Sequence, residues 1–450
     1  MCADCHSTNV RKNYRAEGDL YKTTWTDVSV ACEACHGAGS RHVAWVRQGK
    51  GGDDDGLARA RTSHAEIEMC ARCHSRRAQL TDDVGVDRPL ADSFRPSLLD
   101  EGLYFADGQI EGEVREYGSF LQSRMYAAGV TCGDCHEPHN PKVALRPDEV
   151  CRRCHAPKKF ETPAHHHHGS SSAGSSCVAC HMPARTYMAV AVRRDHSFRI
   201  PRPDLTMKIG TPNACASCHA NRPASWAAAT VSRWFGTART SQPHYGEALA
   251  AARSAAADAE PRLLAVVDDA AQPAIVRATA FSLLARWIDP ESEEALEHAA
   301  HDLDPLVRMA AVDVLKLIPG RPRALVLTLL LVDPIRSVRI EASRALGANL
   351  AEWTAVQRFN ADTAGAHINL GRLYMERGDV AFARQEYETA RRLEPDSAPA
   401  AVNLAELYQA QHRDDEGERV LREALVRTPG VPALHEALEH LLVRRHAVRR

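Results

Sequence analysis

Cysteine and histidine are the residues whose spacing in this chain points most clearly to chemistry. The 14 cysteines all occur in C-x-x-C pairs that are followed directly by histidine, and a shuffled chain would hold only on the order of 0.02 such motifs. The cysteine pairs are Cys2/Cys5, Cys32/Cys35, Cys70/Cys73, Cys132/Cys135, Cys151/Cys154, Cys177/Cys180 and Cys215/Cys218. The histidines that follow them are His6, His36, His74, His136, His155, His181 and His219.

In a C-x-x-C-H motif the two thiols add to the vinyl groups of haem, and the histidine becomes an axial ligand of the iron. The sequence therefore predicts seven covalently attached haems of c type. Zinc is the rival interpretation, because Cys135 and Cys151 are separated by 15 residues, as in a zinc ribbon. Zinc does not explain the histidine after every pair, and a disulfide framework would not need those histidines.

The second axial ligands of the haems must come from histidines outside the motifs. The residues predicted for this role are His42, His64, His139, His165, His168 and His196. His139 follows His136 by three residues and cannot reach the opposite face of the same haem, so we expect it to ligate a neighbouring haem. Of the four consecutive histidines 165–168, one or two can ligate, because neighbouring side chains diverge. A surface or hydrogen-bonding role is the alternative for His42 and His196, and for His64 the two roles are balanced.

Residues 1–240 contain every cysteine and few large aromatic residues, so the haems themselves are expected to supply the apolar filling of this domain. About one haem in every 34 residues requires the haems to pack close together. A closely packed array of this kind moves electrons.

Composition excludes several other classes of protein. The net charge of −2 gives no electrostatic reason to expect nucleic acid as a partner. The longest strongly apolar run, Ala324 to Val332, is about half of what a transmembrane helix needs, so no transmembrane segment is expected.

The first haem motif begins at residue 2, and no signal sequence precedes it. Because haem attachment takes place outside the cytoplasm, we expect the chain to be an N-terminally truncated form of a longer protein that is periplasmic or otherwise extracytoplasmic. A lipoprotein-like mature start is the alternative, but it would place cysteine at position 1, where this chain has Met1.

Two kinds of repeat follow the haem motifs. In residues 246–350, three similar segments (272–284, 304–315 and 333–346) carry Val-Arg pairs at 276/277, 307/308 and 338/339, and this constant spacing predicts HEAT-like helical repeats. Two of these segments open with Asp-Pro, which is typical of a helix start. In residues 362–443 a period of 34 predicts tetratricopeptide repeats, with residues 432–443 as a capping helix. The positions that fit that pattern are Leu370, Gly371, Tyr374, Gly378, Ala383, Tyr387, Ala390 and Pro395, and then Leu404, Ala405, Tyr408, Leu421, Ala424 and Pro429.

The predicted fold is mainly α: a loop-rich multihaem cytochrome c domain over residues 1–240, followed by an α-solenoid of HEAT-like and then tetratricopeptide repeats. Within the long gap between the third and fourth motifs, a D-G turn in residues 103–116 predicts a small hairpin.

Several motif contexts resemble one known superfamily. C-E-A-C-H-G-A-G-S-R-H-V, G-V-T-C-G-D-C-H-E-P-H, C-V-A-C-H-M-P-x-x-x-Y, R-R-D-H-S-F-R-I-P-R-P and T-P-N-A-C-A-S-C-H are similar to motifs of multihaem cytochromes c. The superfamily includes tetrahaem cytochromes, pentahaem nitrite reductases and octahaem hydroxylamine oxidoreductases. The resemblance covers residues 1 to about 236 and implies an extracytoplasmic redox protein.

The resemblance also implies where a catalytic haem would lie. In the nitrite reductases the active haem has lysine in place of the motif histidine. When the motifs are aligned in order from the C-terminal one, that haem corresponds to Cys70/Cys73/His74. This chain keeps histidine there, so the nitrite reductase signature is absent. The candidate open site is His74 with His165 and His168 of the histidine run and Arg76 or Arg77; the alternative is a wire in which every haem has two histidine ligands.

Three hypotheses follow. The chain carries electrons and docks a redox partner protein, such as a membrane quinol oxidase module or a terminal reductase, through its repeats. Alternatively, it is an oxidoreductase that acts on a small nitrogen or sulfur compound at one five-coordinate haem. A scaffold with redox-sensing haems is the third. An iron without a second histidine would favour the enzyme.

Overall fold

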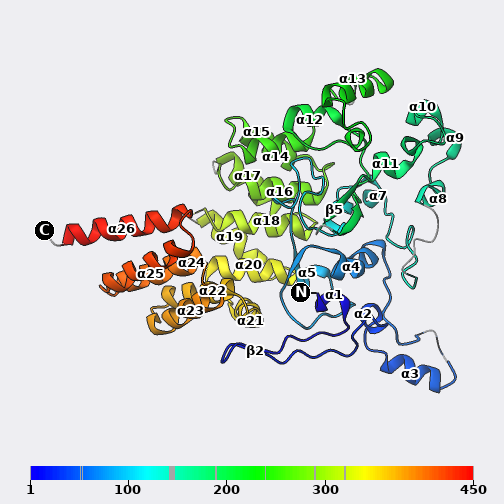
Figure 1. Cartoon of the computed structure of the whole chain (residues 1–450). Coiled ribbons are helices and arrows are strands. Elements are labelled where there is room, and N and C mark those ends of the chain that lie inside the picture. Colours follow the sequence, from blue (N-terminus) through cyan, green and yellow to red (C-terminus); the bar gives the residue numbers. More distant parts are fainter. Residues whose placement is uncertain are drawn as a thin grey trace. The chain divides into compact units, whose positions relative to one another are not determined.

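The computed structural model describes residues 2–50, 52, 54–140, 147–187, 190–238, 240–287, 290–318 and 321–448. The chain is mainly helical, with three short two-stranded antiparallel sheets among the described residues. It forms two compact units (Figure 1): unit 1 contains Met1–His6, Ser29–Gln79 and Asp83–Ala348, and unit 2 contains Ser7–Val28, Leu80–Asp82 and Asn349–Arg450. No helix in the described part of the chain is long and apolar enough to cross a membrane.

The motif-bearing part of unit 1 consists of short elements joined by loops. Its helices are α1 (Ala3–His6), α2 (Glu33–His36), α3 (Ser40–Arg47), α4 (Ser63–His74), α5 (Leu90–Ser93), α6 (Glu116–Phe120), α7 (Arg124–Ala127), α8 (Pro147–Arg152), α9 (Pro157–Phe160), α10 (Pro163–His166), η1 (Ala173–Ser175), α11 (Cys177–His181), α12 (Pro203–Ile209), η2 (Ala214–Ser217) and α13 (Ala224–Phe235). Strand β3 (Arg77–Gln79) pairs with β4 (Phe94–Pro96), and β5 (Ala184–Tyr187) pairs with β6 (Ala191–Arg194). This architecture confirms the predicted loop-rich helical region.

The hairpin expected within residues 103–116 is reduced to a single bridge between Tyr104 and Ile110. The Phe105 amide donates to the Gln109 carbonyl at 2.9 Å, and Gly108 adopts a positive φ of 80° in the turn. Tyr104 and Ile110 are both buried in the core, and beyond the bridge the amides of residues 111 and 112 both turn onto the Leu103 carbonyl. The ladder therefore ends after one pair.

The C-terminal part of unit 1 is a stack of helices. It comprises α14 (Tyr245–Arg253), α15 (Ala259–Val267), α16 (Ala274–Leu284), α17 (Pro290–Ala299), α18 (Pro305–Leu315), α19 (Arg321–Leu330) and α20 (Arg336–Leu346). The three repeated segments become α16, α18 and α20, and the valine of each Val-Arg pair is fully buried. The arginines explain the constant spacing: Arg277 pairs with Asp302 and Arg308 with Asp333, each 25 residues further along the chain.

Only one of the two Asp-Pro pairs starts a helix as predicted. Asp304 caps α18 by accepting from the Leu306 amide at 2.9 Å. Helix α20 begins two residues after Pro334. The Asp333 carboxylate accepts from the Ile335 amide at 2.8 Å and also pairs with the Arg308 guanidinium at 2.7 and 3.0 Å. The same carboxylate therefore serves the turn before α20 and a buried ion pair between repeats.

The repeat helices of unit 1 share one hydrophobic core with the segment that surrounds the third motif. Ile67 and Ala71 of α4 belong to this core together with Phe281 of α16. Polar contacts join the same parts: the Leu99 amide donates to Thr279 Oγ1 at 3.1 Å, and Arg95 pairs with Glu341 at 2.8 Å. The stack therefore forms a rigid support for the helix that carries Cys70, Cys73 and His74.

Unit 2 contains α21 (Ala351–Phe359), α22 (Ala364–Glu376), α23 (Val380–Leu393), α24 (Ala398–Ala410), α25 (Asp414–Arg427) and α26 (Pro432–Val448). Helices α22 to α25 form the predicted tetratricopeptide pairs, and α26 begins where the capping helix was expected. Gly371 is required where it lies, because a Cβ there would be 2.7 Å from Cδ1 of the buried Tyr387 ring. The small residue and the aromatic ring thus allow α22 and α23 to pack closely.

A segment from the N-terminal end of the chain completes unit 2. Strands β1 (Tyr14–Arg15) and β2 (Leu20–Tyr21) form a hairpin. Lys12 Nζ pairs with Asp362 at 2.7 Å and lies 4.4 Å from the centre of the Phe359 ring. The segment between the first two motifs is thereby fixed to α21 and the start of α22.

Candidate metal centres

Each motif forms a tight turn. In five motifs the amide of the motif histidine donates to the carbonyl of the first cysteine, at 2.8 Å for His36 and 3.1 Å for His6. The third and sixth motifs lie within helices α4 and α11. None of the 14 cysteines is in a disulfide. Each motif therefore presents two thiols and one imidazole from the same turn, which is the donor set that covalent haem attachment requires.

The motif cysteines differ in burial, although the sequence predicts the same haem-binding role for all of them. Ten are half-buried, and the exposed ones are Cys2, Cys32, Cys154 and Cys218. Each exposed cysteine lies just outside the helical turn of its own motif. Cys154 follows the end of α8 and Cys218 follows the end of η2, whereas Cys2 and Cys32 precede α1 and α2.

The other cysteine of each of these four motifs is half-buried. Burial raises the pKa of the Cys151 thiol in the fifth motif and of the Cys215 thiol in the seventh. Their partners Cys154 and Cys218 lie in turns that surrounding side chains leave open to solvent. The two thiols of the fifth motif, and those of the seventh, therefore differ in burial. Attachment of haem to Cys154 and Cys218 stays a prediction.

Four of the motif histidines face a histidine from outside the motifs. The distances between ring centroids are 6.0 Å for His36 and His139, 6.3 Å for His136 and His196, 6.1 Å for His165 and His181, and 6.3 Å for His168 and His219. The planes of the rings in these pairs are inclined by 11°, 27°, 15° and 30°, respectively.

This spacing fits one metal ion between two imidazoles. Bonds from metal ions to imidazole nitrogen are about 2.0–2.1 Å long, so two imidazoles on opposite sides of one ion have centroids about 6 Å apart. All four measured distances agree with that value. The residues present therefore fit axial ligation of a haem iron by two histidines.

The remaining ring nitrogens support the same geometry. Nδ1 of His36 lies 2.9 Å from the Ala58 carbonyl, and Nδ1 of His181 lies 2.7 Å from the Arg199 carbonyl. His196 Nδ1 lies 2.9 Å from the carbonyl of Arg194, the last residue of β6. A carbonyl at Nδ1 fixes the tautomer and orientation of the ring and leaves Nε2 available to a metal.

The run of four histidines divides its side chains between two motifs. His165, at the end of α10, faces His181, whereas His168 faces His219. Between them His167 adopts a left-handed conformation with φ of 54° and stacks on Trp234 at 4.2 Å. His166 lies outside both pairs, and its Nδ1 accepts from the His168 amide at 3.2 Å.

Three motif histidines, His6, His74 and His155, have no opposing histidine ring in the described part of the chain. His74 differs from the paired histidines, because its Nδ1 contacts the Glu116 carboxylate at 3.0 Å, and this hydrogen bond raises the pKa of His74. The His155 ring contacts Phe160 edge-on, with centroids 5.5 Å apart.

Neither His42 nor His64, both predicted as distal ligands, contacts a motif histidine ring among the described residues. His42 Nδ1 lies 2.9 Å from the Asp55 carbonyl, and its ring stacks near Trp45. His64 Nε2 lies 3.3 Å from the Glu68 carboxylate. The orientation of His42 leaves Nε2 available, whereas that of His64 does not.

The open site expected at His74 is not assembled from the predicted residues. His165 and His168 are placed against His181 and His219, and so they do not complete the surroundings of His74. Arg77 lies over the Phe94 ring at 3.8 Å and points to Cys5 Sγ of the first motif, also at 3.8 Å. Arg76 is exposed. Glu116, which the sequence did not single out, is the polar residue that contacts His74.

Direct contacts connect the seven motifs into one series. Cys5 of the first motif contacts the Cys73 carbonyl of the third at 3.7 Å, and the Gly133 amide of the fourth donates to Glu66 on the helix of the third at 2.7 Å. His139, beside the fourth motif, reaches the second.

The later motifs continue the series. Arg153 of the fifth motif donates to the Asp134 carbonyl of the fourth at 2.7 Å. The Cys177 amide of the sixth donates to the carboxylate of Asp148, beside the fifth, at 3.0 Å, and α11 of the sixth packs on η2 of the seventh. Every motif is thus in contact with another motif or with the residues beside it.

Apolar side chains do not form a core around most of these motifs. In the described residues of 1–66 and 124–177, no hydrophobic side chain is buried, whereas the segment from Ile67 to Leu121 contributes thirteen buried hydrophobic residues to unit 1. Valines near the second motif are exposed: the exposed fraction is 55% for Val30 and 45% for Val43. An apolar macrocycle held by each motif fits these surroundings.

Comparison with known proteins identifies the two repeat regions. The family HEAT repeats matches residues 260–347, and the family Tetratricopeptide repeat matches residues 374–441. The chain contains both kinds of repeat, as its sequence periods predicted. One solved structure, the outer cell wall cytochrome OcwA, is similar with a TM-score of 0.40 and 18% identity, over 70% of this chain and 75% of that chain. No curated protein matches the chain.

Proposed function

We propose that this chain is a multihaem c-type cytochrome with seven covalently attached haems that transfers electrons in an extracytoplasmic redox chain. The observation that carries the proposal is the set of four histidine pairs, each spaced for one iron. When bound, haem supplies a one-electron redox centre at every motif. The protein itself would hold each ring by two thiols and one motif imidazole, and at four motifs it positions a second imidazole.

The series of motif contacts supports electron transfer along the chain. Haems held by neighbouring motifs lie close together, because backbone and side-chain contacts of 2.7–3.7 Å join those motifs. An electron that enters at one motif therefore has a neighbouring acceptor at each step. A periplasmic or otherwise extracytoplasmic location follows from the chemistry of attachment, which takes place outside the cytoplasm.

The repeats would dock a redox partner protein. Stacked helical repeats bury a continuous core and leave an extended surface, which is suited to protein binding. A membrane quinol oxidase module and a terminal reductase are the partner classes consistent with an electron carrier. Part of the surface of the repeat helices in unit 1 is covered by the segment around the third motif. The repeats of unit 2 therefore offer more surface for a partner protein.

The histidine run provides the sharpest test. His165→Ala and His168→Ala should each convert one low-spin haem in seven to a high-spin form, because each variant removes one axial ligand. His166→Ala is the matched control and should leave the spin states of the unaltered protein unchanged. Electron paramagnetic resonance and visible spectra measure the spin states, and intact mass measures the number of attached haems. A fully low-spin His168→Ala protein, or a metal content of zinc, would overturn the proposal.

A second candidate function is supported by the surroundings of His74. A carboxylate bonded to the far nitrogen of an axial histidine makes that ligand more basic, and His74 is the motif histidine with this contact in the described residues. A five-coordinate iron there would serve an oxidoreductase acting on a small nitrogen or sulfur compound. Carbon monoxide titration of the reduced protein tests it: one equivalent bound, with a band shift altered by Glu116→Gln, supports the enzyme, and no binding excludes it.

A further inference from the structure

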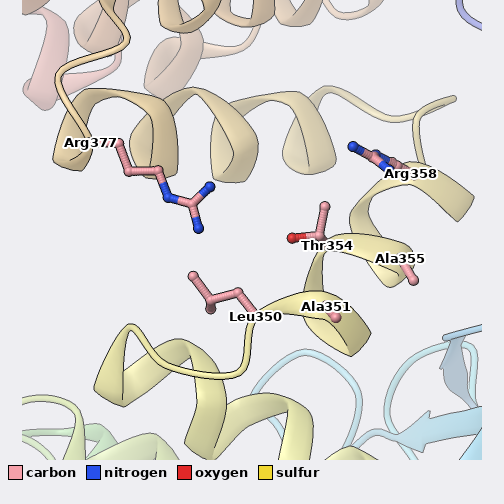
Figure 2. A pocket seen from close by; sticks show the side chains of 6 residues that line it. All are labelled: Leu350, Ala351, Thr354, Ala355, Arg358 and Arg377. Atoms are coloured by element: carbon pink, nitrogen blue, oxygen red, sulfur yellow. The ribbon is translucent and has the colours of Figure 1, made fainter.

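Unit 2 contains a cleft of about 590 Å³ that the electron-transfer proposal leaves without a role. Helix α21 supplies most of its lining, and the end of α22 supplies the rest. Figure 2 shows the six lining residues, which are Leu350, Ala351, Thr354, Ala355, Arg358 and Arg377. The side chains of Arg358 and Arg377 extend toward the same space from two different helices.

The two arginines have no carboxylate partner in the described part of the chain, and both are exposed. Other arginines of unit 2 are paired: Arg391 with Glu423 at 3.1 Å, and Arg445 with Glu418 at 2.8 Å. The cleft therefore combines two uncompensated positive charges with a methyl-rich wall and one hydroxyl group. None of its lining residues is acidic.

Such a lining is complementary to carboxylates that flank a short apolar stretch. Guanidinium groups bind carboxylates in a bidentate manner, and they attract an approaching anionic surface over a Debye length of about 8–10 Å. The cleft is open to solvent and bounded by helices, so an extended segment of another protein can lie along it.

We propose that the Arg358–Arg377 cleft binds an acidic segment of the redox partner protein. This inference rests on the proposed electron-transfer function. One electron then passes between the docked partner's redox centre and a haem of this chain, so that one is oxidised as the other is reduced.

The test measures binding of a fluorescein-labelled hexaglutamate peptide to the full-length haem-loaded protein by fluorescence anisotropy. We expect saturable binding that weakens as salt rises, and a loss of at least tenfold in affinity in the Arg358→Glu, Arg377→Glu double variant. Arg427→Glu, an exposed arginine on α25 outside the cleft, is the charge-matched control and should bind as the unaltered protein does. Equal binding by the double variant, or an equal loss in Arg427→Glu, overturns the proposal.

Two further measurements separate this proposal from the function on which it rests. Helical circular dichroism verifies that the double variant is folded, and intact mass verifies that seven haems remain. If the peptide binds through the cleft but the haem count is not seven, only the cytochrome proposal is contradicted. If seven haems are present but the peptide does not bind through the cleft, the proposed role of the cleft is contradicted. Hexaglutamate displaced by equimolar inorganic phosphate would identify a simple anion site and would also count against an acidic protein segment.

Discussion

The repeat helices and the haem-motif segments are stabilised in opposite ways. In the repeats, apolar side chains such as Leu263, Leu284 and Leu327 are fully buried, and helix packs on helix. In the described parts of residues 1–66 and 124–177, no apolar side chain is buried, and the recurring contacts are histidine pairs and single hydrogen bonds. A repeat therefore encodes its own stability, whereas a haem-motif segment encodes the attachment points of the group that we propose stabilises it.

Preventing haem attachment should have the largest effect on this contrast. Replacing all motif cysteines by alanine should leave residues 29–66 and 124–177 without stable structure, because only the bound group can bury apolar surface there. The tetratricopeptide helices should remain folded. Hydrogen exchange read by mass spectrometry compares the two regions, with the haem-loaded protein as control. Equal protection of the motif segments with and without haem would contradict the contrast.

A core substitution in unit 2 tests the opposite half of the comparison. Tyr387→Ala should cost about 3–5 kcal/mol, because it removes a buried ring that fills the space beside Gly371. Phe382→Ala is the control, since that ring is 58% exposed. Urea unfolding followed by circular dichroism measures both, and the haem bands should not change. A shift of the haem bands in Tyr387→Ala would show that the two regions are not energetically independent.

Acidification should weaken unit 1 through His244, which lies at the start of the repeat stack. Burial and the nearby Arg199 lower the pKa of His244 from 6.5 to about 3, and its Nδ1 accepts from the Gly246 amide at 3.0 Å. In the unfolded chain His244 is protonated below about pH 6.5, whereas in the folded protein it stays neutral down to about pH 3. Stability should therefore fall by about 1.4 kcal/mol per pH unit across this window, or about 2 kcal/mol at pH 5.

His244→Asn is the matched variant, because asparagine keeps an acceptor at the helix cap and does not titrate. The difference in urea unfolding free energy between pH 7 and pH 5 should be smaller in the variant than in the unaltered protein by about 2 kcal/mol. Identical pH dependence in the two proteins would remove His244 from this account.

The smallest expected effect concerns one helix cap in the repeats. Asp304→Ala should cost about 1 kcal/mol, because the Leu306 amide loses its acceptor at the start of α18. Asp304→Asn keeps an acceptor and should cost less. Thermal unfolding of the two variants measures the difference, and a larger loss in the asparagine variant would show that charge rather than capping matters.

The sequence allowed local features to be predicted better than distant pairings. Seven motifs and two repeat periods could be read directly, because each is defined within a short window of residues. That His139 faces His36 could not be predicted, since 103 residues separate them and loops without a period lie between. The ion pair of Asp333 with Arg308 could not be predicted for a similar reason, because the arginine belongs to the preceding repeat.

The exposure of single motif cysteines also could not be predicted from the motif itself. The five-residue pattern is the same in the fifth and seventh motifs as in the sixth, yet Cys154 and Cys218 are exposed whereas Cys180 is half-buried. The difference arises because α11 continues through the second cysteine to His181, whereas α8 and η2 end before it. Where a short helix ends depends on its neighbours in space, which the motif does not encode.

The membership of residues 7–28 in unit 2 also had no sequence signal. The hairpin lies about 330 residues before α21, and single contacts such as Lys12 with Asp362 fix it there. Likewise Glu116 gave no indication of its contact with His74, because a lone carboxylate at a helix start is usually explained by the helix dipole.

The positions of the paired histidines along the chain would determine when each proposed haem receives its second histidine ligand. His139 and His196 lie downstream of the motif histidines that they face, His36 and His136. His165 and His168 lie upstream of theirs, so in the proposed cytochrome they would already have emerged when the sixth and seventh motifs reach the attachment machinery. During export from the N-terminal end, the second and fourth haems would therefore wait with one face open, whereas the last two would be closed as soon as they are attached.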